Sequence, residues 1–230
     1  MNRKIIAAVL LIAVMVGGLN VRMLVKAQDN SDSESYIQLD VDYSSDEEKY
    51  YQANEELICL GATVTKMRTN KFLDVTKYYQ SGQTWSNDIM KEKNLTIGSA
   101  GCCLTSFSMI QRYLGGTLNP GEVNSKLGNY ACLFNYDGAA STFGYKIQNK
   151  VHKEVGDDTA IDFIAGAIEK NYPVLVGLEK DDGSGTHFVC AFGYNGRNVY
   201  IHDPASGRDY TQLSQYLKNY HVNRLYVYSK

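Results

Sequence analysis

The chain has 230 residues, of which 44% are hydrophobic and 21% are charged, and its formal net charge is −2. This length and composition are typical of a globular protein with one sizeable folded domain. A nearly neutral chain without a basic tract argues against a surface for nucleic acid and against a strongly basic membrane-binding surface.

Residues 1–27 have the pattern of a secretory signal peptide. Arg3 and Lys4 give a positive start, residues 5–19 form an apolar run, and small residues near Ala27 suit cleavage by a signal peptidase. An uncleaved membrane anchor is the alternative, although the apolar run is shorter than the roughly 20 residues that span a bilayer. We therefore expect a secreted or cell-surface protein on the extracellular side of a bacterial membrane, which touches the membrane only if the signal stays attached.

The region between the signal and the globular domain divides into two parts. Residues 28–46 are rich in Asp, Glu and Ser and poor in large aliphatic side chains, so we predict an acidic, disordered linker. A propeptide that covers an active site is the alternative. Residues 47–77 are predicted to be an N-terminal extension, helical over residues 47–60, with strand-like alternation over residues 63–79. The folded domain is expected to span residues 78–230.

The number and spacing of the cysteines indicate whether disulfides or a metal site are expected. They are Cys59, Cys102, Cys103, Cys132 and Cys190. An exported protein with an odd number of cysteines keeps at least one thiol out of internal disulfides, and the spacing resembles no disulfide framework. The sequence leaves open whether Cys59, Cys132 and Cys190 form disulfides. Because no C-x-x-C or H-x-x-x-H spacing occurs, a structural zinc site is not expected.

The first half of the folded domain is predicted to be mainly helical. Residues 78–90 read as a loop around Trp85. Apolar residues then recur three to four positions apart over residues 104–114, which predicts a helix that a glycine pair ends. A second helix is expected to start at Asn119, because a proline and a glutamate follow it in the first turn. Residues 132–146 show no clear period and are predicted to be irregular.

The second half of the domain is predicted to be an antiparallel sheet with two helices. The expected helices cover residues 159–170 and 211–219, and the expected strands cover residues 173–179, 187–194, 198–204 and 224–228. Asn195 and Gly196, between the second and third strands, are a strong hairpin signal. Helices followed by an antiparallel sheet predict the α+β class, with the two halves packed together.

The paired cysteines lie at the expected start of the first helix. A thiol in the first turn faces unsatisfied backbone NH groups and the positive end of the helix dipole, which favour the thiolate, so Cys102 is a candidate nucleophile. Gly98 and Gly101 are expected to let the backbone turn sharply and approach a substrate closely. Cys103 points about 100° around the helix from its neighbour and is expected in the core. The alternative is that both cysteines are buried small hydrophobic residues.

A thiol nucleophile needs a base, and the candidates are His152, His187, His202 and His221. His187 follows a glycine-rich turn and opens a strand, and Asp203 ends the partner strand across the hairpin. A three-residue turn would place these two side chains opposite each other, whereas a two-residue turn would direct Asp203 to the other face. The sequence leaves this register open, and a third expectation is that a bulge or a longer loop would favour the pair. His202 is the main rival, but it is expected on the face opposite Asp203.

Three blocks of the sequence resemble the papain-like cysteine peptidases of the bacteriocin-processing, double-glycine leader peptidase type, in particular their stand-alone secreted relatives. The blocks are YYQSGQTWSNDIM, AGCCLTSFSMIQRYLGG and GSGTHFVCAFGYNGRNVYIHDPASG. They cover about residues 78–228 and present Gln, Cys, His and Asp in the order of that family. The resemblance implies a papain-like fold with a helical N-terminal half packed on an antiparallel sheet.

The resemblance also implies a role for each matching residue. Cys102 corresponds to the nucleophile, His187 to the general base and Asp203 to the residue that orients the imidazole. Gln80 corresponds to the side-chain donor of the oxyanion hole, the group of NH donors that stabilises a tetrahedral intermediate. Cys103 stands where that family usually has Gly or Ala.

The function implied is an exported cysteine peptidase that cleaves peptide bonds of a peptide or protein substrate through a thiolate and an acyl-enzyme. No metal or organic cofactor is expected. A cell-wall peptidoglycan amidase or endopeptidase with the same Cys and His pair is one alternative. An inactive peptide-binding module is another, and a transferase in which an amine replaces water is a third.

Overall fold

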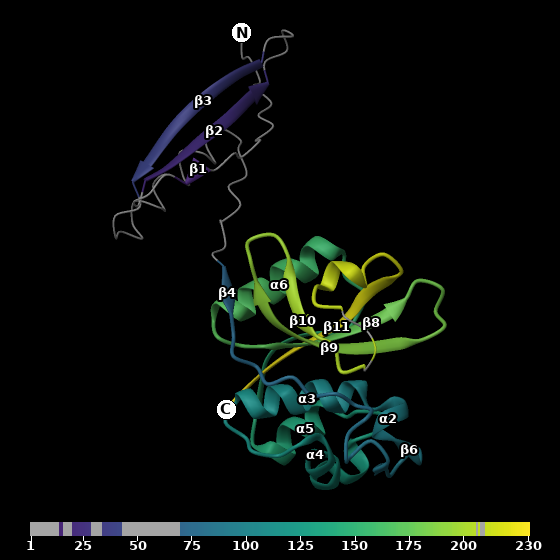
Figure 1. The fold of residues 1–230 in the computed structure, drawn as a ribbon. Helices are drawn as coiled ribbons and strands as arrows, with labels where there is room; N and C mark the ends of the chain where they lie inside the picture. The colour runs from purple at the N-terminus through teal and green to yellow at the C-terminus, as the bar shows by residue number, and fades with distance from the viewer. Residues whose placement is uncertain (1–13, 16–19, 29–33, 43–69, 206, 208–209) are drawn as a thin grey trace. The chain divides into compact units, whose positions relative to one another are not determined.

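The computed structural model describes residues 14–15, 20–28, 34–42, 70–205, 207 and 210–230 (Figure 1). The chain divides into two compact units, Met1–Met67 and Arg68–Lys230. The described strands of the first unit are β1 (Val14–Met15), β2 (Asn20–Gln28) and β3 (Glu34–Asp42). β2 pairs antiparallel with both of the others.

The β2–β3 pair spans the expected junction between the signal peptide and the acidic linker at residue 28. Those boundaries remain predictions, and so does the start of the folded domain at residue 78. The helix expected over residues 47–60 lies outside the described residues. None of the described helices is both long and apolar enough to cross a membrane.

The second unit combines short helices with one main sheet. Its helices are α2 (Ile97–Ala100), α3 (Cys102–Tyr113), α4 (Pro120–Leu127), α5 (Tyr136–Phe143) and α6 (Asp157–Glu169), and its short 3-10 turns are η1 (Gly128–Tyr130) and η2 (Leu213–Gln215). Its strands are β4 (Lys71–Phe72), β5 (Ile89–Met90), β6 (Leu95–Thr96), β7 (Lys146–Val151), β8 (Val174–Lys180), β9 (Thr186–Tyr194), β10 (Val199–His202) and β11 (Tyr220–Ser229).

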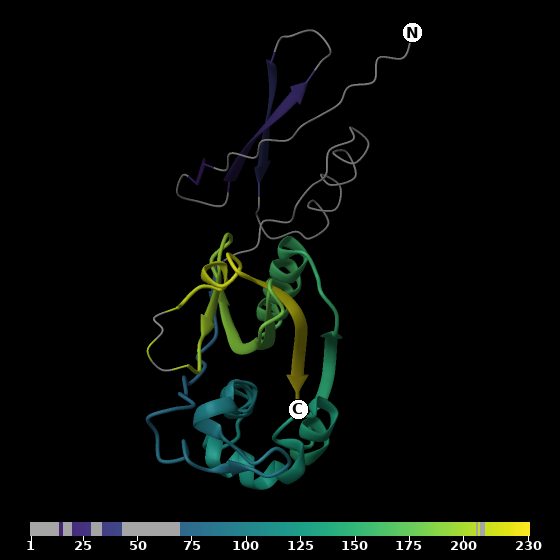
Figure 2. The same cartoon turned by 90° about the vertical axis from the view of Figure 1, so that its right-hand side faces the viewer.

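The main sheet is antiparallel, with the strand order β10-β9-β8-β11-β7, and β4 adds a short pairing with β9. α3 packs on β9 and β8, and Figures 1 and 2 show α3 and α6 with the sheet between them. The predicted α+β class, with a helical N-terminal half on an antiparallel sheet, is therefore confirmed.

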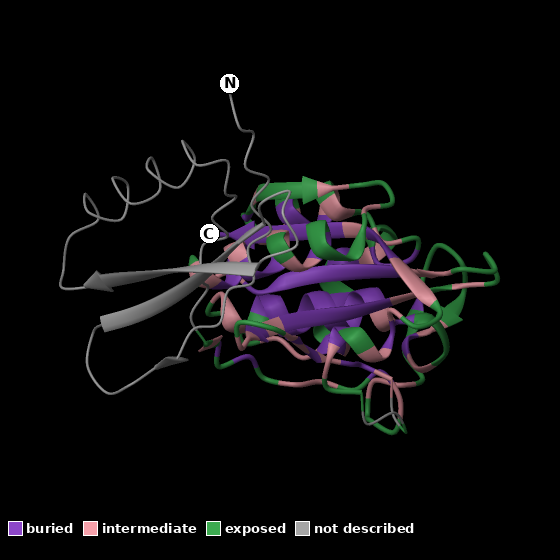
Figure 3. Ribbon diagram, turned by 90° about the horizontal axis from the view of Figure 1, so that it is seen from above, coloured by how far each residue is buried: buried purple, intermediate pink, exposed green. Residues whose placement is uncertain are grey.

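The core lies between α3 and the sheet, where β8, β9 and β11 are buried over most of their length (Figure 3). Leu104, Phe107 and Ile110 are at most 1% exposed, as the spacing of apolar residues predicted. The ring of Phe107 lies 5.2 Å from that of Tyr228 at the C-terminal end of β11. Complete burial of a side chain of this size contributes roughly 1.5–3 kcal/mol, so these contacts fix α3 on the sheet.

Several parts of the second unit differ from the prediction. Residues 132–146, expected to be irregular, contain α5. Its ends follow ordinary capping chemistry, because Asn135 Oδ1 accepts a hydrogen bond from Gly138 N at 2.7 Å and Gly144 ends the helix with a φ of 67°. Of the expected helix over residues 211–219 only η2 forms, and the described part of the alternating stretch at residues 63–79 contains only β4.

The start of α4 supplies a test of the local folding signals. Asn119 Oδ1 accepts from Glu122 N at 3.0 Å, and Glu122 Oε2 accepts from Asn119 N at 2.8 Å. We expect Asn119→Ala to lower the free energy of unfolding by about 1 kcal/mol, measured by urea denaturation. Glu122→Gln keeps an acceptor oxygen and serves as the control, with a midpoint near that of the parent protein. An unchanged midpoint for Asn119→Ala would contradict this assignment.

Candidate functional site

Cys102 is the first residue of α3, as the sequence predicted. It directly follows Gly101, which joins α2 to α3 and caps α3 without a side chain. The NH groups of a first helical turn lack intrahelical acceptors, and the helix dipole is positive there. The thiol of Cys102 is partly exposed at this end of the helix.

Cys103 has a different environment, although it is the next residue. It is only 8% exposed and belongs to the hydrophobic core. Burial raises the pKa of its thiol well above the ordinary value, and the neighbouring Cys102 adds to this effect. Cys103 is therefore a neutral, space-filling side chain.

Gly98 and Gly101 are also required by packing within the chain. A Cβ atom on Gly101 would lie 2.5 Å from the carbonyl oxygen of Ile97. A Cβ atom on Gly98 would lie 2.9 Å from the carbonyl oxygen of Ser86, which accepts the hydrogen bond of Gly98 N. The two glycines thus allow the chain to pack against its own backbone ahead of α3.

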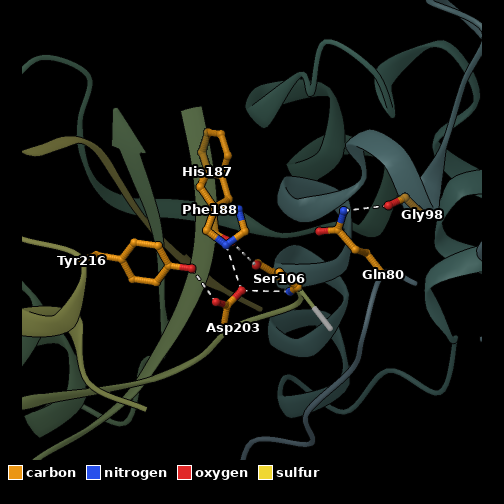
Figure 4. Close-up of polar contacts among 8 residues, drawn as sticks. Gln80, Gly98, Ser106, His187, Phe188, Asp203 and Tyr216 are labelled. Atoms are coloured by element: carbon orange, nitrogen blue, oxygen red, sulfur yellow. Dashed lines mark hydrogen bonds and ion pairs between the residues drawn. The ribbon is translucent and has the colours of Figure 1, made fainter. Parts of the chain in front are cut away.

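His187 and Asp203 form a hydrogen-bonded pair, with 2.8 Å between His187 Nε2 and Asp203 Oδ1 (Figure 4). A regular turn of two or three residues does not produce this contact, but a longer turn and an irregular register do, as the third expectation had it. Val199 pairs with Tyr194, which leaves residues 195–198 in the turn, and the register shifts again after Tyr200. The ladder ends with His202 opposite Cys190.

The next position of this ladder would set Asp203 opposite Val189, two residues from His187 on the same face of the sheet. The contact between Asp203 and His187 is therefore diagonal, within the reach that such neighbours have across a strand pair.

The Asp203 carboxylate is completely buried, with 0% exposure. Its Oδ1 accepts from His187 and also from Ala205 N at 2.8 Å, and its Oδ2 accepts from the Tyr216 hydroxyl (Figure 4). Burial alone would raise the pKa of Asp203, but the hydrogen bond and charge of His187 and the Tyr216 hydrogen bond lower it. Asp203 is thus a buried carboxylate with a donor on each oxygen.

The His187 ring lies between this carboxylate and the Cys102 thiol. Burial lowers the pKa of His187, but the hydrogen bonds to Asp203 and to Cys102 outweigh burial and raise it to about 9. Because Nε2 faces Asp203, Nδ1 is the ring nitrogen left for the thiol. The arrangement can hold a thiolate next to an imidazolium.

The spacing between α3 and β9 is fixed close to this pair. Ser106 Oγ donates to the carbonyl oxygen of Phe188 at 3.2 Å, in a buried position (Figure 4). Ser106 lies one helical turn after Cys102, and Phe188 directly follows His187. This hydrogen bond therefore holds the helix carrying the thiol against the strand carrying the imidazole.

A cavity of about 390 Å³ opens in front of the thiol. It is lined by small or polar residues together with the thiol and the imidazole: Gln80, Ser99, Ala100, Cys102, Thr186, His187 and Ala205. Its position beside both Cys102 and His187 gives a ligand access to the sulfur and to the imidazole.

Gln80, which the resemblance implies as the oxyanion donor, is one of the residues that line this cavity. Its backbone NH donates to the carbonyl oxygen of Pro204 at 2.8 Å, which ties the segment before α2 to the residue after Asp203. Its side-chain Nε2 donates one hydrogen to the carbonyl oxygen of Gly98 at 3.0 Å (Figure 4). The second hydrogen of this amide is the one that a ligand can use.

The other histidines are engaged elsewhere. His202 Nε2 contacts the carbonyl oxygen of Val75 at 2.9 Å, and its ring stacks on Phe192 at 4.0 Å. His152 Nδ1 lies 2.6 Å from the Tyr226 hydroxyl, and His221 contacts Asp181. Among the described residues, no group of three or more His, Cys, Asp or Glu side chains is arranged to hold a metal ion.

Tyr216 is the residue of the site that sequence reasoning missed. It follows η2 and is only 1% exposed. No spacing links it to Asp203, and it is one of 18 tyrosines, so the sequence contained no signal that could distinguish it.

Comparison with known proteins shows similarity to one protein family and to solved structures. A family described as the Peptidase_C39 like family matches residues 72–227. The crystal structure of a chain described as a C39-like peptidase from Bacillus anthracis is similar at 14% identity and a TM-score of 0.42, covering 69% of this chain and 97% of the other. No curated protein matches the chain.

The exposure of the thiols predicts their order of reaction. Cys102 is partly exposed, whereas Cys103, Cys132 and Cys190 are buried. A thiol alkylator at neutral pH should therefore label Cys102 first, as followed by mass spectrometry of proteolytic fragments. Earlier labelling of Cys190, or of Cys59, which lies outside the described residues, would contradict the assignment.

The raised pKa of His187 predicts a pH dependence with a definite sign. The pKa moves from 6.5 to about 9, so the protonated ring stabilises the folded protein below about pH 6.5, and this contribution is lost as the pH rises through about 9. Asp203→Asn removes the carboxylate and should lower the pKa of His187, measured by NMR titration of the ring. The His202 ring, whose pKa burial lowers, is the control that should not move.

Proposed function

Because the chain belongs to the Peptidase_C39 like family, whose match covers residues 72–227, we propose that it hydrolyses peptide bonds with Cys102 as the nucleophile. The observation that supports this most directly is the position of the His187 ring between the Asp203 carboxylate and the Cys102 thiol. A base within reach of the thiol, itself oriented by a third group, is the arrangement that activates a nucleophile.

The reaction proceeds through an acyl-enzyme. The proton of Cys102 passes to His187, and the sulfur attacks the carbonyl carbon of the scissile bond to give a tetrahedral intermediate. Collapse of this intermediate breaks the C–N bond, and His187 donates its proton to the leaving amine. His187 then takes a proton from water, and the hydroxide attacks the thioester to release the second product and regenerate the thiol.

The pKa of His187, at about 9, suits its role as partner of a thiolate. At neutral pH the ring is then charged, and the ion pair with the sulfur is available before substrate arrives. Asp203 contributes by holding the ring with Nε2 toward its own carboxylate, which turns Nδ1 toward the thiol. The buried position of Asp203 strengthens this interaction because few water molecules screen it.

The negative oxygen of the tetrahedral intermediate needs NH donors. The backbone NH of Cys102, in the first turn of α3, and the side-chain amide of Gln80 are the donors proposed, because both groups face the same cavity. Loss of one such donor typically lowers kcat by about 10²-fold or more.

The cellular location of the protein and the type of peptidase also belong to this proposal. The signal-like pattern of residues 1–27 supports export, and the acidic residues 28–46 then form a linker between that signal and the enzyme. The three sequence blocks around Gln80, Cys102 and His187 support the bacteriocin-processing type. The substrate is a peptide or protein outside the cell.

Turnover of a peptide library tests the proposed function. We expect the parent protein to cleave the library and Cys102→Ala to abolish cleavage, because the nucleophile is lost, with products identified by mass spectrometry. Cys103→Ala is the matched control and should retain most activity, since that thiol only fills space. Equal product formation by Cys102→Ala and the parent protein would end the proposal. Cleavage confined to peptidoglycan stem peptides would reassign the substrate to the cell wall.

A further inference from the structure

We propose that Tyr216 is a positioning residue for this reaction, acting through Asp203. This inference rests on the proposed function, because it assigns Tyr216 the task of keeping the Asp203 carboxylate ionised and aligned toward His187.

The two oxygens of Asp203 are divided between two tasks. Oδ1 accepts from His187 Nε2 at 2.8 Å and from Ala205 N at 2.8 Å, while Oδ2 accepts from the Tyr216 hydroxyl (Figure 4). A carboxylate that accepts hydrogen bonds at both oxygens cannot rotate about its Cβ–Cγ bond without losing a donor. Tyr216 therefore fixes the plane in which Oδ1 meets the imidazole.

Tyr216 also contributes to the burial of this pair. Its ring centroid lies 5.4 Å from that of His187, and Asp203 has no exposed surface. Hydrogen bonds to a charged group are stronger where water is excluded, but an unpaired charge is more costly there. Oδ2 of Asp203 would carry this cost if the Tyr216 hydroxyl were absent.

The chain around Tyr216 is organised to hold this ring in place. Gln215 Oε1 accepts from Thr211 N at 2.8 Å and from Gln212 N at 2.9 Å, which closes the turn just before Tyr216. Ile201 N donates to the carbonyl oxygen of Thr211 at 2.9 Å, which ties the turn to β10. The segment that carries the hydroxyl is thus anchored to β10, the strand that directly precedes Asp203.

Two further rings confine the tyrosine from its sides. Tyr210 and Tyr220 meet the Tyr216 ring edge-on, at centroid distances of 4.9 Å and 5.3 Å. Edge-to-face contacts of this kind fix ring orientation as well as burying surface. The hydroxyl of Tyr216 is accordingly preorganised and does not depend on Asp203 for its position.

Tyr216→Phe removes only the oxygen and supplies the test. Because Tyr216 does not line the cavity in front of the thiol, KM should stay within about twofold, while kcat falls by about 10-fold, the effect of one hydrogen bond to a charged group. The pKa of Asp203 should rise, so the acid limb of the pH profile should move to higher pH. A purely structural role would not move that limb.

Tyr228→Phe is the matched control. Tyr228 is also completely buried, and its hydroxyl donates to the carbonyl oxygen of Tyr136 at 3.4 Å, away from Asp203. This variant should keep the parent values of kcat and the parent pH profile. The assignment of Tyr216 would be overturned if the acid limb of the pH profile shifted equally in both variants or shifted in neither.

A double-mutant cycle with Asp203→Asn gives a second, independent criterion. If Tyr216 acts through Asp203, Tyr216→Phe should have little further effect once the carboxylate is gone. The proposal would be contradicted if the double variant lowered kcat by the product of the two single-variant factors.

The pH dependence of Cys102 alkylation separates this inference from the proposed function, because it needs no substrate. A shifted alkylation profile in Tyr216→Phe would support positioning even if no peptide were cleaved, an outcome that would refute only hydrolysis. An unshifted profile would refute positioning even if hydrolysis is found. Circular dichroism of the variant confirms that the comparison is made between folded proteins.

Discussion

The buried carboxylate of Asp203 is the constraint on which the rest of the site depends. A charge without contact to water is tolerated only when protein donors replace the water, and here three donors do so: His187, Ala205 and Tyr216. Each of these donors belongs to a different piece of structure. The hydrogen bonds to this one carboxylate therefore link β9, the turn after β10 and the segment after η2.

The reactive sulfur depends on a second relation, the distance between a helix end and a sheet edge. α3 brings the positive end of its dipole to Cys102, and the Ser106 hydrogen bond to the backbone of Phe188 sets how far that end lies from β9. The apolar face of α3 supplies the stability, with Phe107 buried against the sheet. One helix thus supplies both the thiol of the site and the apolar side chains that pack on the sheet. Cys103 is one of the side chains that pack.

Helices and strands were predicted well where the capping residues and the spacing of apolar residues indicate the same element. The periodicity of α3, the capping box of α4 and the apolar run of β8 all appear as expected. α5 was missed because its buried residues are the small Ala139 and Ala140, which give no strong period, although Asn135 and Gly144 marked its ends.

The resemblance named four residues that lie together in the structure, but their geometry was only partly predicted. Gln80, Cys102, His187 and Asp203 all lie at one site, as the resemblance implied. The strand register was beyond the sequence, because the turn at residues 195–198 and the irregularity after Tyr200 depend on packing. Tyr216 was equally inaccessible, since its partner is chosen by tertiary structure. The backbone hydrogen bond from Gln80 N to the carbonyl oxygen of Pro204 also has a consequence for folding. It joins a residue ahead of α2 to a residue after β10, so this wall of the cavity beside Cys102 is complete only when both distant parts of the chain have come together.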